Sequence, residues 1–134
     1  MEVISIKQPY ATLIAEGYKE YEFRTWKTKY RGEVLIHASL KDDKIAMEKY
    51  KELDLDYPKG CIIAKATIND CLEINDNFRK MIKPKNVYPY IYDHVLNSDD
   101  NKYAFHMANV KKIDKIYDKG NLGLWNYEIK DKMD

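Results

Sequence analysis

The segment from Gly17 to Gly32 constrains the fold and the function of this chain more than any other. Its first half, residues 17–24, reads Gly-Tyr-Lys-Glu-Tyr-Glu-Phe-Arg, which alternates apolar and charged side chains as a β-strand does. The alternation places Tyr21 and Phe23 on one face and the charged side chains on the other. An ordinary strand of the core rarely carries so many charged side chains, so we expect a binding or catalytic site here.

A basic loop with two aromatic side chains follows this strand directly. Two of the three arginines in the chain lie between residues 24 and 31, although lysine occurs 20 times, and this stretch has no acid. A chain that uses lysine for bulk charge keeps arginine where a planar, bidentate fork is needed. Aromatic rings stack on bases while cations follow phosphates. The loop therefore predicts a single-strand surface, with packing of the tryptophan on the core and a merely solvated loop as open alternatives. Its residues are Trp26, Lys27, Lys29, Tyr30 and Arg31.

The alternation and turn signals along the rest of the chain predict an α+β domain. Strand patterns cover residues 2–6, 19–24, 33–38, 61–72 and 103–110, and helical patterns cover 8–16 and 42–53. The connections are too short for repeated βαβ crossovers, so we expect a small, mixed, mostly antiparallel β-barrel with flanking helices. The stretch 73–101 has the least regular hydrophobic pattern, and it predicts only a helix with a long loop.

Size and composition exclude several classes of protein. The 134 residues suffice for one domain with a real core and are too few for two ordinary ones, so we expect a single domain over 1–134. No apolar run approaches the ~18 residues of a membrane span, and the N-terminus lacks the layout of a signal peptide, so we expect a cytoplasmic protein without a membrane partner. The two cysteines and three histidines show no metal-binding spacing, so we expect no metal and no cofactor. The net charge of +1 excludes a uniformly basic nucleic-acid binder and leaves local clusters as the relevant feature.

Several sequence blocks, in the right order, resemble the ASCH (activating signal cointegrator homology) domain family. Residues 5–11, Ser-Ile-Lys-Gln-Pro-Tyr-Ala, resemble its start, and residues 17–24 resemble its G-x-K-x-x-E-x-R signature. Residues 26–32 match its W-x-T-x-x-R-G continuation. Shorter blocks at 35–39, 57–61, 70–72 and 119–125 also fit. The resemblance covers nearly the whole chain apart from the middle, and is to the variety found at the end of the transcription coactivator that names the family.

This resemblance implies a PUA-like fold, a five- or six-stranded β-barrel whose cleft is partly formed by the helix after the first strand. Family members are regarded as nucleic-acid-binding, chiefly RNA, and some act as hydrolases or nucleases. The resemblance therefore implies a nucleic-acid partner, RNA more than DNA, for which the cleft takes a base or nucleotide. A small anionic ligand, a nucleoside or a protein partner in the same cleft are further alternatives.

The family also includes a compact bacterial amidohydrolase that removes the acyl group from N4-acetylcytidine. Its catalytic set is a lysine, a threonine three residues later and a distant glutamate. Lys19 fits the lysine, but Glu22 stands at the threonine position. A small hydrolase of a modified nucleoside or of RNA, using Lys19 and Glu22, is therefore the alternative function, and whether the chain is an enzyme stays open.

The candidate site residues outside the basic loop fall into two groups. Lys19, Glu22 and Arg24 form the cleft motif, in which Lys19 binds a phosphate or, if burial lowers its pKa, acts as a base. Glu22 either orients Arg24 toward a ligand or forms a structural ion pair with it. Gln8 at a helix start and Ser39 after the central strand are second-tier candidates for polar contacts in the cleft.

Overall fold

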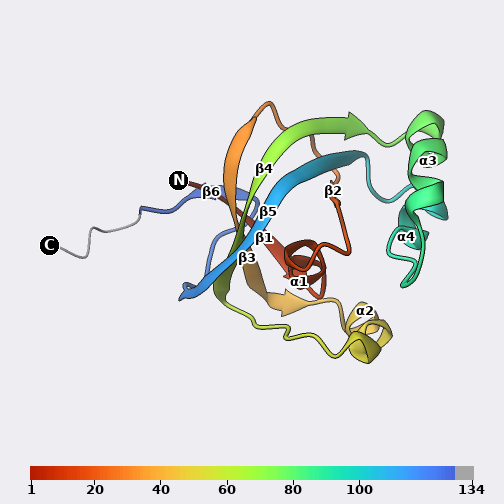
Figure 1. Cartoon of the computed structure of the whole chain (residues 1–134). Helices are drawn as coiled ribbons and strands as arrows, with labels where there is room; N and C mark the ends of the chain where they lie inside the picture. The colour runs from red at the N-terminus through yellow and green to blue at the C-terminus, as the bar shows by residue number, and fades with distance from the viewer. Residues whose placement is uncertain (129–134) are drawn as a thin grey trace, which may run out of the picture.

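The computed structural model describes residues 1–128 and shows, within them, one six-stranded sheet flanked by helices (Figure 1). The strands are β1 (Glu2–Gln8), β2 (Tyr21–Arg24), β3 (Gly32–Asp42), β4 (Cys61–Glu73), β5 (Tyr103–Tyr117) and β6 (Leu124–Asn126). The helices are α1 (Tyr10–Ala15), α2 (Lys44–Lys49), α3 (Asp76–Ile82) and α4 (Asp93–Leu96), with 3₁₀ turns at Lys51–Leu53 and Lys83–Lys85. The predicted α+β class is confirmed. Residues 129–134 of the expected domain lie outside the described residues.

The sheet has the strand order β2-β5-β4-β3-β1-β6, and each neighbouring pair is antiparallel except β1 with β3. A parallel pair needs a long connection, which α1 and β2 supply. The β1–β3 register places Ile4 opposite Ile36, and both are fully buried. The apolar run at 33–38 therefore lies in a central strand, as predicted.

The sheet is strongly curved (Figure 1), and side chains link its edge strand β2 to β1. Although β2 and β1 are not neighbours in the sheet, Nη2 of Arg24 on β2 donates to the carbonyl of Ser5 on β1 at 2.6 Å. Just after β2, the Trp26 ring packs edge-on against Phe105, with centroids 5.1 Å apart. Trp26 also lies 3.8 Å from where a Cβ atom on Gly123 would stand, just before β6. The result is a small barrel with a polar seam between β2 and β1.

Apolar side chains fill the barrel and the space between the barrel and the helices. The inner cluster contains the fully buried Ile68 and Phe105. The outer cluster joins β2 to α3 and α4, where Tyr21 meets Phe78 edge to face with centroids 5.4 Å apart. The stretch 73–101 is therefore a helical cover held by aromatic packing, on one side of the sheet in Figure 1.

Strand β5 is longer than its sequence pattern predicts. It runs to Tyr117, and its second half pairs with the start of β4. The register shifts between Lys65 and Thr67, and Asn109 has a φ of +51°. Such bulges interrupt the alternation of side chains, which is why the pattern predicts an early end at Val110. No helix among residues 1–128 is long and apolar enough to cross a membrane.

The loop between β5 and β6 is pressed onto His37 of β3. The His37 Nε2 atom lies 2.6 Å from the carbonyl oxygen of Asp118. A Cβ atom added to Gly120 would collide with the His37 imidazole, and Gly120 has a φ of +77°. Both the backbone conformation and the close approach therefore require glycine at this position.

We expect Gly120→Ala to lower the free energy of unfolding by about 2–4 kcal/mol. Backbone strain contributes about 1 kcal/mol and overpacking against His37 about 1–3 kcal/mol. Gly17→Ala is the matched control, because Gly17 has a φ of +85° but nothing within 4 Å of its Cβ position. Urea unfolding of both variants measures the difference. Equal losses would contradict the close approach of the loop to His37.

Candidate functional site

A pocket of about 560 Å³ opens at the seam between β2 and β1. Its walls come from these two strands, from α1 and α4, from the end of β3 and from the loop between β5 and β6. This volume lies within the range of small-ligand sites in proteins. The segment that closes the barrel is thus also the segment that builds the pocket.

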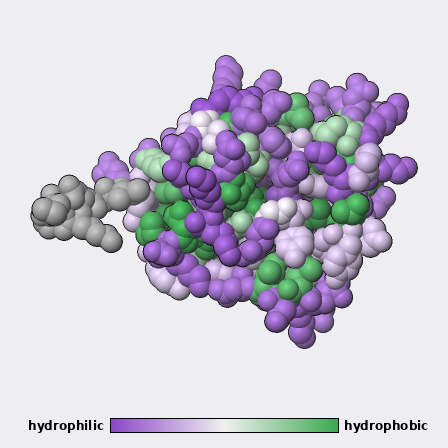
Figure 2. Space-filling model, in the orientation of Figure 1, coloured by the Kyte–Doolittle hydropathy of each residue, from purple (hydrophilic) through white to green (hydrophobic). Residues whose placement is uncertain are grey.

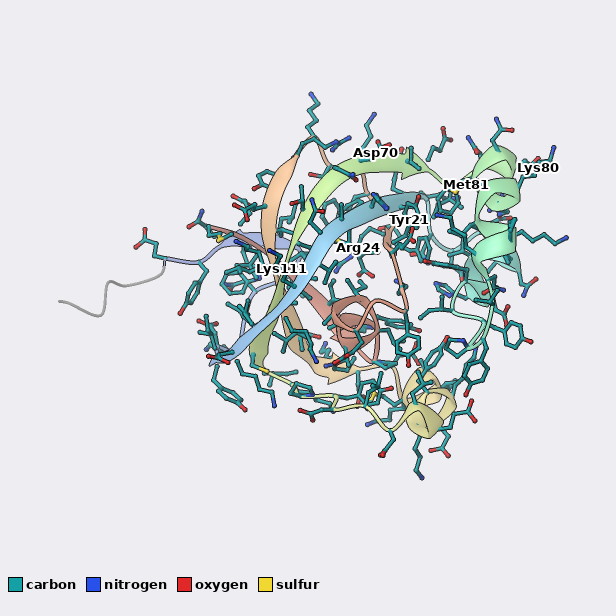
Figure 3. The ribbon with its side chains drawn as sticks, in the orientation of Figure 1. Tyr21, Arg24, Asp70, Lys80, Met81 and Lys111 are labelled. Carbon is teal, nitrogen blue, oxygen red and sulfur yellow. The ribbon has the colours of Figure 1, made fainter. Side chains whose placement is uncertain are left out.

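The three residues of the cleft motif meet in this pocket. Nζ of Lys19 lies 3.1 Å from Oε1 of Glu22, and Nε of Arg24 donates to the other carboxylate oxygen at 3.0 Å. The Lys19 side chain is 2% exposed, that of Glu22 9% and that of Arg24 18%. Figure 3 shows Arg24 within the space that the curved sheet encloses. One carboxylate is therefore shared by two cations, and the cluster has a net positive charge.

Burial and mutual attraction shift the pKa values of this cluster. Burial alone would raise the pKa of the Glu22 carboxyl, but Lys19 and Arg24 outweigh it and hold that pKa below its ordinary value. Burial lowers the pKa of the Lys19 ammonium, and the attraction of Glu22 opposes this only in part. Glu22 is therefore a carboxylate with both oxygens engaged by cations, which makes it a weak base.

Aromatic rings form one wall of the pocket. The Lys19 ammonium lies 4.6 Å from the centroid of the Phe23 ring and 5.3 Å from that of Tyr10, distances at which the rings attract a cation. The His94 ring lies 5.4 Å from Phe23 and 6.2 Å from Tyr10. Although the His94 side chain is exposed to solvent, the protein atoms around it lower its pKa to about 4, and the Lys19 charge adds to this effect. The pocket therefore presents an uncharged imidazole at neutral pH.

Positive charge dominates the lining of the pocket. It contains five cationic side chains and two carboxylates. Lys7, Lys41 and Lys119 are exposed, while the second acid, Asp43, accepts a hydrogen bond from the Tyr10 hydroxyl at 2.8 Å. Leu40, which is exposed, also lines the pocket. Figure 2 shows a comparable mixture over one face of the molecule, with green apolar patches set among purple polar residues. The pocket suits an anionic ligand that has an apolar part.

The two second-tier candidates have different positions. Ser39 lines the pocket, and its hydroxyl donates to the carbonyl of Lys41 at 3.1 Å. Gln8 is fully buried and is not part of the lining. Its amide donates to Thr12 at 2.7 Å and to the carbonyl of Pro58 at 2.8 Å. The Gln8 side chain points into the core. Its two bonds hold the start of α1 against the segment that contains Pro58.

The basic loop lies outside the pocket lining. The Tyr30 hydroxyl donates to the carbonyl of Glu33, and Arg31 donates to the carbonyls of Thr28 and Tyr30. Lys27 and Lys29 are exposed. Trp26 packs on the core and is still 37% exposed, and its ring lies 5.9 Å from the Arg24 guanidinium. The loop thus adjoins the pocket through Trp26, and its binding role stays a prediction.

His94, Tyr10 and the lysines at the pocket mouth are site residues that were not predicted from the sequence. His94 lies in the stretch 73–101, where the apolar side chains show no regular period, so no sequence signal pointed to it. Tyr10 and Lys7 belong to the first block of the family resemblance, and Lys119 begins the last block. Because those blocks lie far apart in sequence, only the closure of the barrel shows that they meet.

Comparison with known families matches the ASCH domain over residues 4–117. The chain belongs to the ASCH domain family. Its fold is of the PUA-like kind, which is associated with RNA binding. No group of three or more His, Cys, Asp or Glu side chains among residues 1–128 is arranged to hold a metal ion.

Similar proteins include activating signal cointegrator 1 of Homo sapiens and of Mus musculus. Each is 26% identical over 140 residues, covering 95% of this chain and 22% of the relative. The chain therefore spans about a fifth of the length of these relatives. Among solved structures, ASCH from Zymomonas mobilis superimposes with a TM-score of 0.56 at 18% identity, covering 87% of this chain and 72% of that one. A variant of that protein with a tyrosine replaced by phenylalanine gives 0.56 at 17% identity. These structures support the fold.

We expect Glu22→Gln to destabilise the protein by about 3–5 kcal/mol, because it leaves the buried Lys19 and the partly buried Arg24 without their shared anion. Glu20→Gln is the control, since Glu20 is exposed and pairs with Lys85 at 3.2 Å on the surface. A surface pair of this kind contributes less than about 1 kcal/mol. Urea unfolding at neutral pH measures both, and equal small losses would contradict the buried cluster.

The effect of Glu22→Gln should also depend on pH. The folded-state pKa of Glu22 lies below the unfolded value of about 4.3, so its stabilisation is fully present above that pH. The stabilisation is lost as the pH falls through the folded-state pKa. The difference in unfolding free energy between wild type and variant should therefore shrink in acid, and a constant difference would contradict the assignment.

Proposed function

We propose that this protein binds single-stranded nucleic acid, RNA in preference to DNA, and takes one base or nucleotide into the pocket at the barrel seam. The observation that carries the proposal is the buried Lys19, Glu22 and Arg24 cluster on the wall of a net positive pocket. Such a cluster is preorganised, so little conformational entropy is lost when a ligand binds. Association of the PUA-like fold with RNA binding supports the same class of partner.

Arg24 is the side chain best placed to recognise a ligand oxygen. Its bonds to the described residues use Nε, toward Glu22, and Nη2, toward the Ser5 carbonyl. A guanidinium has five N–H donors in a fixed plane. The Nη1 donors are therefore oriented by the other two bonds and can bind a base carbonyl or a phosphate oxygen.

The aromatic wall and the pocket mouth can bind the other parts of a nucleotide. The uncharged His94 ring offers a stacking surface, and stacking of a base on an aromatic side chain contributes about 1–3 kcal/mol. The exposed Lys7, Lys41 and Lys119 suit phosphates at the mouth. Asn121 and Ser39 add neutral polar groups there, and such groups can bond the 2′-hydroxyl that distinguishes RNA from DNA.

The basic loop should hold the strand outside the pocket. Charge reversal at Lys27, Lys29 and Arg31 is expected to weaken binding of all single strands alike. It should also flatten the dependence of log K on log salt by about 0.7 for each phosphate contact that is lost. Fluorescence anisotropy with short RNA and DNA oligonucleotides, titrated at several salt concentrations, measures both effects.

The matched control reverses charge at Lys51, Lys80 and Lys111, which are exposed and lie outside the pocket and the loop. Lys80 points outward from α3 in Figure 3. This variant has the same change of net charge and should lose less affinity than the loop variant. If the two variants bind alike, the loop is a solvated surface without a path for the strand.

A hydrolase that uses Lys19 and Glu22 is the second candidate, because burial lowers the pKa of Lys19. The engagement of both Glu22 oxygens argues against Glu22 as a base. We therefore expect no appreciable hydrolysis of N4-acetylcytidine. Chromatography of the nucleosides measures this reaction. Steady turnover by the wild type that disappears in Lys19→Ala and Glu22→Gln variants, each shown to be folded under the assay conditions, would show that the chain is an enzyme of this kind.

A further inference from the structure

A serine and a histidine that the proposed binding site does not use are hydrogen-bonded beside the pocket. Oγ of Ser5 lies 3.0 Å from Nδ1 of His37, and Nε2 of the same ring lies 2.6 Å from the carbonyl oxygen of Asp118. A carbonyl oxygen can only accept a hydrogen bond, so Nε2 carries the proton of the neutral imidazole. Nδ1 is then an acceptor, and the Ser5 hydroxyl donates its proton to it.

The Ser5 oxygen retains capacity for attack on a ligand. A serine hydroxyl has one proton and two acceptor lone pairs. The proton faces His37, and Trp125 Nε1 donates to one lone pair at 2.9 Å. The other lone pair of Oγ has no partner among these bonds. Ser5 itself is partly exposed and lines the pocket. The Trp125 N–H fixes the position of Oγ while the serine proton moves to His37.

Positive charge stands next to this serine. Nη2 of Arg24 donates to the Ser5 carbonyl at 2.6 Å, which fixes the guanidinium beside Ser5, and Lys19 lines the same pocket. A ligand carbonyl attacked by Ser5 would develop its negative charge in a pocket that both of these cations line. Preorganised donors at such a position are a large source of transition-state stabilisation.

We propose that Ser5 is a nucleophile and His37 its general base, so that the pocket accepts the acyl group of activated carboxylic esters. The nucleophile lies within hydrogen-bond reach of the base, and the base lies within reach of a third, orienting group, here the Asp118 carbonyl. Oγ forms a bond to the ester carbonyl carbon while its proton passes to Nδ1. The bond from that carbon to the leaving oxygen then breaks, and the leaving group departs with the electron pair as an anion. The products are an ester on Ser5 and an imidazolium at His37.

The burial of His37 restricts this chemistry to good leaving groups. His37 is fully buried, so its proton does not readily reach a leaving nitrogen, and water does not readily reach Nδ1. Acylation should therefore be followed by slow release of the acyl group. Amides such as N4-acetylcytidine should not react, which separates this activity from a hydrolase that uses Lys19 and Glu22.

The test is covalent labelling of the whole chain with 4-nitrophenyl acetate and, separately, with diisopropyl fluorophosphate. Mass spectrometry of the intact chain and of its peptides should find one group per chain, on Ser5. Ser5→Ala should abolish the label. His37→Gln, which keeps an N–H for Asp118, should slow labelling about 100-fold or more. Ser98→Ala is the control, because Ser98 lies outside the pocket and its loss should leave the label unchanged.

Melting temperatures and RNA affinity of each variant show whether the fold and the pocket persist, independently of labelling. Ser5 labelling no faster than that of Ser39 or Ser98 in the wild-type chain would overturn the proposal, whatever the variants do. Equally fast labelling of Ser5 in a folded His37→Gln variant would overturn it as well. Failure of RNA binding with intact labelling would instead count against the proposed nucleic-acid function.

Discussion

The Glu22 carboxylate, shared between Lys19 and Arg24, is the interaction on which the rest of this structure depends. An anion buried with one cation would be a neutral pair, but here the second cation leaves a positive charge at the edge of the pocket. Arg24 then continues from Glu22 to the carbonyl of Ser5 and so links β2 to β1 across the barrel seam. The same three side chains therefore close the fold and set the charge of its pocket.

This arrangement explains why a small barrel can present a preformed binding site. Arg24 links the strands across the seam, so the side chain that holds the strands together also presents its remaining donors to a ligand. The loop between β5 and β6 contributes the other side of the mouth, and its position depends on the contact between Gly120 and His37. Pocket shape is thus tied to barrel closure, and a ligand that binds the pocket should stabilise the fold.

The sequence allowed the cleft motif to be predicted, because a period of two places Glu22 and Arg24 on one face of a strand. It also allowed the central strand to be predicted, from its continuous apolar run. It did not indicate that Gln8 points inward, since a polar side chain at a helix start is usually exposed and its partner at Pro58 is far away in sequence. His94 was missed for a similar reason, because α4 reaches the pocket only through aromatic packing in the outer cluster.

An NMR titration of the isotope-labelled chain with a short single-stranded RNA tests most directly whether the seam pocket binds nucleic acid. If the seam pocket binds RNA, the Arg24 Nε–H signal, the His94 ring signals and the backbone amides of Gly120 and Gly123 should shift together with one dissociation constant. The same signals should move less with DNA of the same sequence. Shifts confined to the outer faces of α2 and α3, with Arg24 unmoved, would contradict the assignment of the seam pocket as the binding site.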